Sequence, residues 1–317
     1  MKKILITGIT GFVGKNLAIY LHQNGYEIYG LGRTIPEKED WHVKTIKAFY
    51  SYDDAIDYNH FDTIIHTAGK AHDLKNVSNE QAYFIANTEL TEKIYSQFSI
   101  SNARKFIYFS SVKAVADTVD EEYLIEDIIP NPKTPYGQSK LKAEQYILNQ
   151  VTPSDKLVYI LRPSMIHGPG NKGNLNLLFS VIQKGIPYPL GTFDNKRSFT
   201  SIENVLFIIQ ELIEKTIDPG VYNVCDDEPV STNELIRLIA KSCGKKPKIL
   251  YIPKVIMIAI AAIGDVLHIP LNSERLKKLT ESYVASNKKL TSALGIKRLP
   301  VSSKEGLIRT FQSFNNQ

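Results

Sequence analysis

Close to its N-terminus the chain reads Lys3-Ile4-Leu5-Ile6-Thr7-Gly8-Ile9-Thr10-Gly11-Phe12-Val13-Gly14, followed by an apolar-periodic segment at 17–21. A buried strand, a glycine-rich turn and a helix in this order form the context that a dinucleotide-binding fingerprint requires. Glycine accepts positive φ and lets the backbone approach a ligand, and the following helix offers free N–H groups to a pyrophosphate. An ordinary strand–helix turn looks the same, so the interpretation needs support from the rest of the chain.

A second group of residues provides that support. Tyr136-Gly137-Gln138-Ser139-Lys140 places a tyrosine and a lysine at i, i+4 on one helix face, and an apolar run before it ends in Ser110-Ser111. A phenol with an ordinary pKa of about 10 transfers protons poorly at neutral pH, whereas a nearby ammonium favours the phenolate. A serine hydroxyl beside them can bind the reacting oxygen. An exposed Tyr–Lys pair is the alternative, but the combination with the glycine turn favours catalysis.

Composition narrows the class of protein. The chain has 317 residues, 43% hydrophobic and 22% charged, which is ordinary for a globular protein. Its net charge is +5 without a long basic run, so no nucleic-acid partner is predicted. Cys225 and Cys243 are its only cysteines, and they indicate neither a disulfide framework nor a metal site. Glycines interrupt the first apolar stretch, which argues against a signal peptide and for a cytoplasmic location.

Apolar runs alternate with helical patterns in the first half of the chain. We expect strands at 4–7, 27–31, 63–67, 105–110 and 157–161, and helices at 13–23, 79–98 and 136–150. This order predicts an α/β fold, a Rossmann-type doubly wound parallel sheet with ligands at the carboxyl ends of its strands. Glycine and proline crowd the chain after Arg162, and short helices follow at 204–215, 232–243 and 254–266. We therefore expect a Rossmann domain at 1–165 and a smaller C-terminal substrate-binding lobe at 166–317, with the chain free to cross back between them.

The apolar segment 255–263 has two interpretations. It is too short for a bilayer span, which needs about 20 apolar residues. A buried helix is the favoured expectation. The alternative is an apolar surface that gives peripheral contact with a membrane or with a lipid-linked substrate.

With these residues in hand, nearly the whole chain resembles the extended short-chain dehydrogenase/reductase family, in particular its nucleotide-sugar epimerases, dehydratases and reductases. The resemblance implies catalytic roles for Ser111, Tyr136 and Lys140. The interval from Ser111 to Tyr136 is that of UDP-galactose 4-epimerases, which favours Ser111 over Ser110. The cofactor-binding residues that it implies are Gly8, Gly11, Phe12, Val13, Gly14, Thr67, Ala68, Gly69 and Asn87, together with Tyr136 and Lys140.

The second half resembles the nucleotide-sugar branch. Leu161-Arg162-Pro163 and His167-Gly168-Pro169-Gly170 are similar to the family's LRPxxxYGPG, with His167 in the place of the tyrosine. A guanidinium fork fits phosphate oxygens, although a solvated surface arginine is the alternative for Arg197. The substrate-binding residues implied are Lys70, Ser111, Asn174 and Arg197.

Two departures from the family pattern bear on the reaction. The family's 4,6-dehydratases carry an Asp-Glu pair where Val112-Lys113 follow Ser111 here, so dehydration is not expected. NAD-binding members usually carry an acidic residue where this chain has Gly32, and Arg33 comes next. NADP(H) is therefore favoured, with Arg33 on the 2′-phosphate, and NAD stays possible because Arg33 can also stack on adenine.

The resemblance then implies an NAD(P)-dependent enzyme acting at C4 of a UDP-N-acetylhexosamine type of sugar. Reduction of a 4-keto sugar in bacterial surface polysaccharide synthesis is favoured, with Tyr136 as acid/base. A 4-epimerase with retained NAD, acting on a UDP-sugar or a polyprenyl-diphospho-sugar, is the alternative. A non-catalytic nucleotide-binding scaffold is the alternative from another class. A homodimer through the helices at 79–98 and 136–150 is also implied.

Overall fold

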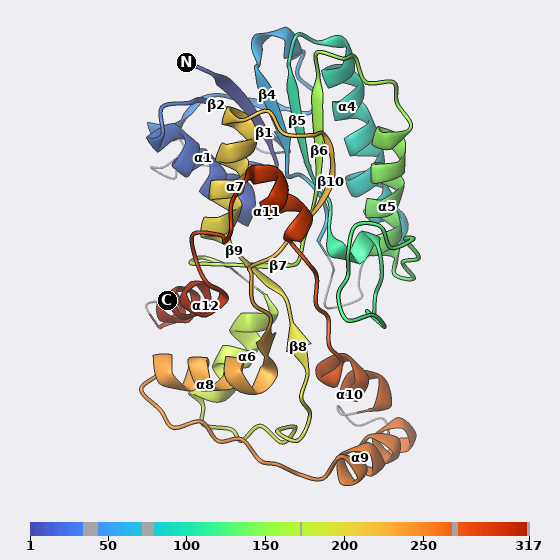
Figure 1. Ribbon diagram of the computed structural model, residues 1–317, viewed down its shortest axis with the longest axis vertical. Helices are drawn as coiled ribbons and strands as arrows, with labels where there is room; N and C mark the ends of the chain where they lie inside the picture. Colours follow the sequence, from blue (N-terminus) through green and yellow to red (C-terminus); the bar gives the residue numbers. More distant parts are fainter. Residues whose placement is uncertain (34–43, 72–78, 172, 268–271, 316–317) are drawn as a thin grey trace.

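A seven-stranded sheet forms the centre of the larger lobe. The computed structural model describes residues 1–33, 44–71, 79–171, 173–267 and 272–315 (Figure 1). The strand order is β10-β6-β5-β4-β1-β2-β3, and every pairing is parallel. The strands are β1 (Lys3–Thr7), β2 (Glu27–Gly32), β3 (Ile46–Ser51), β4 (Thr63–His66), β5 (Lys105–Phe109), β6 (Leu157–Pro163) and β10 (Gly220–Val224). The predicted Rossmann-type α/β fold is therefore confirmed.

Helices cover both faces of this sheet. The inner strands are apolar on both faces because each face is covered, as parallel sheets require. On one face α1 (Phe12–Gln23) and α7 (Ile202–Glu214) pack in one apolar core with Ile4, Ile6 and Ile107. On the other face α4 (Leu90–Ile100) and α5 (Pro135–Leu148) pack with Leu5, Ile64 and Phe106. The carboxyl ends of the strands point toward the smaller lobe (Figure 1).

The structure differs from the expected elements in three places. Strands β3 and β10 were not anticipated; β3 is a half-exposed edge strand, and its residues lack a continuous apolar run. The expected helix at 79–98 is α3 (Gln81–Phe84), then a π-helical turn at Ile85–Glu89, then α4. Such turns widen a helix locally and are frequent at functional sites.

The smaller lobe is made mostly of helices. Two short strand pairs lie at its junction with the sheet: β7 (Met165–His167) with β9 (Phe199–Ser201), and β8 (Lys196–Arg197) with β11 (Val230–Ser231). One apolar core joins three helices, α6 (Asn174–Gln183), α8 (Thr232–Ser242) and α12 (Ser303–Phe314). The other helices are α9 (Lys254–Leu267), α10 (Ser273–Thr280) and α11 (Lys288–Leu294), of which α11 packs near β10. Helix α7 and strand β10 return from the smaller lobe to the sheet, so the chain crosses between the lobes as the sequence analysis allowed. The division of the chain at residue 165 stays a proposal.

The expectation of a buried helix at 255–263 is wrong. Among the residues of α9 whose burial is described, Met257, Ala261 and Gly264 are buried, and the apolar side chains of Val255, Ile256, Ile258, Ile260, Ile263 and Leu267 are exposed. The helix lies at the end of the molecule farthest from the sheet (Figure 1). None of the described helices is long and apolar enough to cross a membrane.

Candidate active site

The glycine loop between β1 and α1 is built for close approach of a ligand. Gly8 has a φ of +65°, and a Cβ there would lie 2.7 Å from the backbone of Ala68. A Cβ on Gly14 would collide with the Gly8 carbonyl. Gly11 is the N-cap of α1, where no side chain caps the helix and no acidic residue occupies the first turn. The first N–H groups of α1, on Phe12, Val13 and Gly14, are therefore free to bind an anion.

The turn after β4 lies against this loop. Thr67 Oγ1 donates to the Thr7 carbonyl at 2.6 Å, and the Ala68 N–H donates to Thr7 Oγ1 at 3.2 Å. A Cβ on Gly69 would lie 2.7 Å from Asn87 Oδ1 and 3.1 Å from Lys140 Nζ. The turn 67–69 therefore passes directly between the glycine loop and the helix that carries Lys140.

Asn87 holds that turn in place. It is fully buried in the π-helical turn, where its Oδ1 accepts from the Lys70 N–H at 2.7 Å. Its Nδ2 donates to the Lys70 carbonyl at 3.1 Å and to Ser139 Oγ at 2.9 Å. Its polar atoms thus bind protein groups, and the structure places Asn87 as a support for the predicted cofactor site.

Ser111 and Tyr136 meet at the carboxyl end of β5. Ser111 caps the short helix Val112–Ala114, and its Oγ accepts from the Lys113 N–H at 3.1 Å. Its side chain also forms a hydrogen bond with Tyr136 in the first turn of α5. Desolvation raises the pKa of Tyr136, whereas the bond from Ser111 lowers it. The two residues that the sequence paired are therefore in direct contact.

Lys140 lies one turn further along α5 and is almost fully buried. Its Nζ donates to the Phe109 carbonyl at 2.8 Å and lies 5.0 Å from the centre of the Tyr108 ring. Burial lowers the pKa of Lys140 to about 8, although Glu144 opposes this shift. The ammonium group of Lys140 therefore lies close to the turn that contains Gly69, on the same helix as Tyr136.

The lowered pKa of Lys140 predicts a pH-dependent stability. Because its pKa is about 8 in the folded protein against 10.5 in the unfolded chain, the unfolded state binds more protons between these values. The free energy of unfolding should therefore rise with pH across this window, by up to about 3 kcal/mol more in the wild type than in a Lys140→Met variant. Urea unfolding of both proteins at several pH values measures the difference. If the difference in the free energy of unfolding between the two proteins does not change with pH, the lowered pKa of Lys140 is contradicted.

Behind Lys140 lies an ion pair that the sequence analysis missed. Glu144 is fully buried one turn after Lys140, and Arg162 on β6 binds its carboxylate with Nε at 3.0 Å and Nη2 at 2.6 Å. Ser110 Oγ also donates to Glu144. Ser110 is therefore engaged in this network, and Ser111 alone of the two serines meets Tyr136. The i, i+4 spacing from Lys140 places Glu144 on the same helix face, but it does not indicate Arg162 as the partner of Glu144.

The predicted substrate-binding residues lie around the junction of the lobes. Lys70 Nζ lies 5.6 Å from the centre of the Tyr83 ring, which packs edge-on against Tyr136 with ring centroids 6.2 Å apart. Asn174 is exposed at the first position of α6. His167, at the place of the family's tyrosine, is fully buried and bonded to Thr310 at 2.9 Å. Of the four predicted substrate-binding residues, Ser111 contacts Tyr136 directly and Lys70 is linked to it through Tyr83.

Arg197 is half-buried rather than solvated. Its guanidinium donates to the Lys278 carbonyl, and its Nε has no hydrogen-bond partner within the described part of the chain. Burial lowers the pKa of Arg197, and the nearby Glu281 carboxylate opposes part of this shift. Lys113, which the sequence analysis did not predict, is close enough that Arg197 and Lys278 lower its pKa further beyond the effect of burial. Three cations and the carboxylates of Asp117 and Glu281 therefore lie near the short helix Val112–Ala114.

Comparisons with known proteins place the chain in a family. The model of the NAD dependent epimerase/dehydratase family matches residues 4–225. The chain belongs to this family. It is 34% identical to a UDP-glucose 4-epimerase of Vibrio cholerae over 77% of this chain and 76% of the relative. It is 24% identical to the N-acetyl-alpha-D-glucosaminyl-diphospho-ditrans,octacis-undecaprenol 4-epimerase of Escherichia coli O157:H7, over 98% of this chain and 94% of that protein.

Solved structures of other enzymes share the fold. A UDP-glucose 4-epimerase of Thermotoga maritima with UDP-glucose superposes with a TM-score of 0.75, 21% identity and 99% coverage of both chains. The Bordetella bronchiseptica enzyme WbmG in complex with NAD gives a TM-score of 0.75 at 17% identity, covering 99% of this chain and 94% of that one. The protein is thus an enzyme of the epimerase/dehydratase type, whose family uses a nicotinamide cofactor.

A nicotinamide dinucleotide fits the residues present in this epimerase/dehydratase-family protein. Side chains on Gly8 or Gly14 would fill the loop, and the uncapped start of α1 offers N–H groups to a pyrophosphate. At the other end of the loop, Tyr52 lies beside the backbone of Gly8 and the guanidinium of Arg33, and burial raises its pKa to about 12. Tyr52 therefore lies next to the glycine loop, and the sequence analysis did not identify it.

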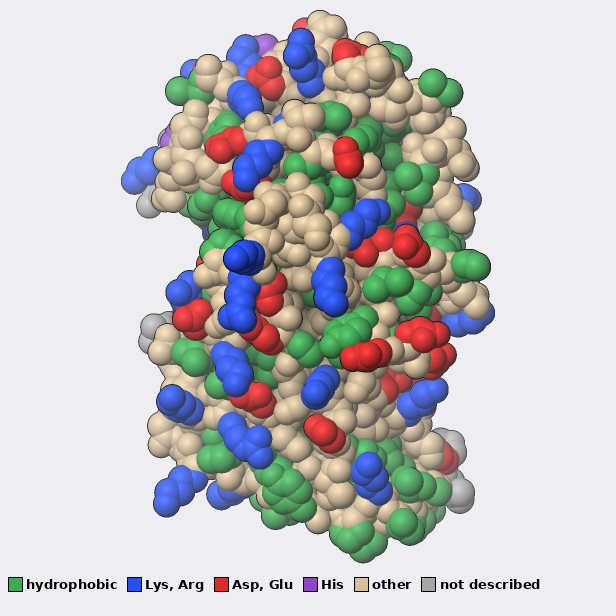
Figure 2. Space-filling model, viewed as in Figure 1, with side chains coloured by type: hydrophobic (Ala, Val, Ile, Leu, Met, Phe, Trp, Pro, Cys, Tyr) green, Lys and Arg blue, Asp and Glu red, His purple; other side chains and the backbone are tan. Residues whose placement is uncertain are grey.

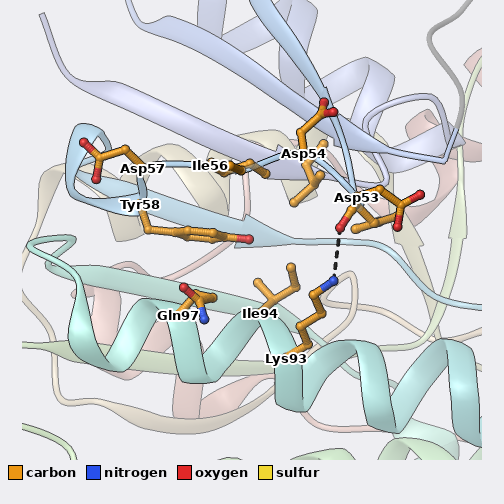
Figure 3. Close-up of a pocket in the computed structure, with 11 residues that line it drawn as sticks. Asp53, Asp54, Ile56, Asp57, Tyr58, Lys93, Ile94 and Gln97 are labelled. Atoms are coloured by element: carbon orange, nitrogen blue, oxygen red, sulfur yellow. Dashed lines mark hydrogen bonds between the residues drawn. The ribbon is translucent and has the colours of Figure 1, made fainter.

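Tyr52 also lines a cavity of about 730 Å³ (Figure 3). The cavity lies between the segment after β3 and α4, where Lys93 Nζ donates to the Tyr52 carbonyl at 3.0 Å. Its labelled side chains include the carboxylates of Asp53, Asp54 and Asp57 (Figure 3). Within the described ranges, no group of His, Cys, Asp or Glu side chains has the arrangement that would hold a metal ion.

Proposed function

We propose that this enzyme transfers hydride at C4 of a nucleotide sugar and reduces a 4-keto UDP-N-acetylhexosamine in bacterial surface polysaccharide synthesis. The observation that carries the proposal is the contact between Ser111 and Tyr136, with Lys140 buried between them and the Gly69 turn. A hydroxyl pair beside a cation is what proton transfer to a sugar oxygen requires. Catalytic roles for Ser111, Tyr136 and Lys140 are part of this proposal.

In the reducing direction Tyr136 acts as the acid. The nicotinamide supplies the hydride when it is bound. Tyr136 then donates its proton to the keto oxygen at C4, and Ser111 binds the same oxygen. Because desolvation raises the pKa of Tyr136, the phenol holds its proton at neutral pH and is ready to act as an acid. The Lys140 cation stabilises the phenolate that forms after the transfer.

The sugar diphosphate has a matching site. Lys113, Arg197 and Lys278 lie near one another, with the carboxylates of Asp117 and Glu281 close by, and Arg197 Nε has no hydrogen-bond partner among the described residues. Charge-assisted bonds from such donors to phosphate oxygens are strong and directional. We propose that these cations hold the diphosphate, with Lys70 and Asn174 at the edges of the sugar site.

A cofactor with a 2′-phosphate fits the end of β2. A Cβ on Gly32 would lie 3.0 Å from Cζ of Phe49, so an acidic side chain at this position has no room unless that ring moves. Arg33 is exposed beside Tyr52 and can pair with a phosphate. This local geometry supports NADP(H) for this chain.

A 4-epimerase with retained NAD is the second candidate. It is favoured by the UDP-glucose 4-epimerase relative at 34% identity and by relatives' structures that hold NAD. The relative that covers 98% of the chain is named as an epimerase of a polyprenyl-linked sugar, and the exposed apolar face of α9 agrees with a lipid-linked substrate.

The bound nucleotide separates the two candidates. We expect purified protein to release no NAD when it is denatured, and to oxidise NADPH when a UDP-4-keto sugar is added. Arg33→Ala should raise the KM for NADPH about tenfold or more, because a charge-assisted bond is lost, and leave the KM for NADH nearly unchanged. Lys15→Ala, which also removes a cation near the loop, is the matched control. Retained NAD together with epimerisation of a UDP-sugar would establish the epimerase instead.

Two further assignments stay predictions. A homodimer through α4 and α5 is consistent with exposed Ile85 and Leu148 on or next to these helices. A cytoplasmic location follows from the proposed nucleotide-sugar chemistry.

A further inference from the structure

We propose that the end of the smaller lobe is a docking surface for an anionic phospholipid bilayer, with α9 lying in the plane of the interface. The surface consists of the outward face of α9 and of the lysine-lined cavity defined below. The inference concerns where the enzyme is held, and it does not depend on which sugar the active site takes.

The outward face of α9 is apolar where a surface helix normally is polar. Val255, Ile256 and Ile263 expose 77%, 50% and 54% of their surface, whereas Met257 is 2% exposed against the core of the lobe. Further exposed apolar residues on or just before the helix are Leu250, Tyr251, Ile258, Ile260 and Leu267. Figure 2 shows apolar side chains gathered at this end of the molecule, where Figure 1 places α9.

A basic cavity lies on the same lobe. It has a volume of about 370 Å³. Four exposed lysines line it, together with two isoleucines and one glycine: Lys184, Lys245, Lys246, Lys248, Ile182, Ile186 and Gly185. No acidic side chain lines it. Such a cavity is complementary to a phosphate head group, and lysines near a bilayer are attracted to anionic lipids.

The cavity and the helix are joined by an ordered segment of chain. The residues that follow the lysines pair with 188–191: the Tyr188 N–H donates to the Lys248 carbonyl at 2.8 Å, and the Leu250 N–H donates to the Tyr188 carbonyl at 2.8 Å. Gly191 N–H then donates to the Leu250 carbonyl at 3.0 Å. An ordered segment therefore connects the basic cavity to the residues just before α9, and basic and apolar groups together are the combination that interfacial helices use to bind membranes.

A vesicle sedimentation experiment tests the proposal. We expect the wild type to sediment with phosphatidylcholine vesicles that contain about 30 mol% phosphatidylglycerol, and much less with pure phosphatidylcholine. Val255→Ser/Ile256→Ser should lower the partition coefficient about tenfold or more. Ile100→Ser/Val151→Ser is the matched control, because these exposed apolar residues lie elsewhere on the protein, and it should bind as the wild type does.

A second pair of variants tests the charges. Lys245→Gln/Lys246→Gln/Lys248→Gln should lose binding to the anionic vesicles, whereas Lys47→Gln/Lys288→Gln/Lys297→Gln, with the same change in net charge, should retain most of it. Thermal melting and NADPH binding of every variant show that the fold and the cofactor site are intact.

Three outcomes would overturn the proposal. The first is a wild type that does not sediment with the anionic vesicles. The second is equal binding by a surface variant and its control. The third is lipid-free self-association that Val255→Ser/Ile256→Ser abolishes, which would make α9 a protein interface. Loss of NADPH turnover alone would bear on the proposed function and not on this surface.

Discussion

Tyr136→Phe is expected to lower kcat/KM by about a thousandfold, the range of a lost general acid. The change removes one hydroxyl, which binds Ser111 at the carboxyl end of β5. The ring and its edge-on packing against Tyr83 stay in place, so the fold and the affinity for the cofactor should change little. Steady-state kinetics in the reducing direction and a separate binding titration measure the two quantities.

Tyr146→Phe is the matched control for this change. Tyr146 lies on the same helix, and its hydroxyl bonds Ser96 at 2.9 Å on the side away from Ser111. It should retain kcat/KM within about twofold, because it takes no part in proton transfer. Turnover that survives in Tyr136→Phe would show that another group supplies the proton, and the catalytic assignment would then be withdrawn.

Glu144→Gln is expected to lower the free energy of unfolding by about 3–5 kcal/mol, because it leaves the Arg162 guanidinium buried without its counter-ion. Both side chains are almost fully buried, and the Nη2–Oε2 distance is 2.6 Å. The variant should also lower the pKa of Lys140 further, since Glu144 is the group that raises it. Urea denaturation at neutral pH gives the change in stability.

Glu211→Gln is the control for the Glu144 variant. Glu211 forms an ion pair with Lys215 on α7, where both side chains are partly exposed, so its loss should cost less than about 1 kcal/mol. The double variant Glu144→Leu/Arg162→Leu should recover much of the lost stability, because it buries no unpaired charge. A Glu144→Gln protein as stable as the wild type would contradict the role given to this pair.

Local patterns in the sequence were enough to predict the fold class. The strand–glycine–helix order and the apolar runs depend on neighbours within a few residues, which is why the parallel sheet and the glycine loop are confirmed. Strand β10 was missed because it lies beyond the point where the chain first enters the smaller lobe, and it belongs to the sheet only through its pairing with β6.

The i, i+4 spacing of Tyr136 and Lys140 placed them on one face of α5, and that depends on the helix alone. The tertiary structure decided which serine forms a hydrogen bond with Tyr136. Ser110 donates instead to the buried carboxylate of Glu144, so Ser111 is the serine that binds Tyr136. The pairing of Glu144 with Arg162 joins a helix to a strand, so no local spacing could indicate it.

The exposure of α9 was likewise decided by the tertiary structure. An apolar segment predicts burial only if distant parts of the chain cover it, and here contacts reach one side of the helix alone, around Met257 and Ala261. The sequence by itself therefore determined five strands of the sheet, the glycine loop and the tyrosine–lysine helix, because each of these segments carries its own local pattern of residues. The tertiary structure decided which charges are paired and which apolar surface is left open, because burial depends on contacts between residues far apart in the chain.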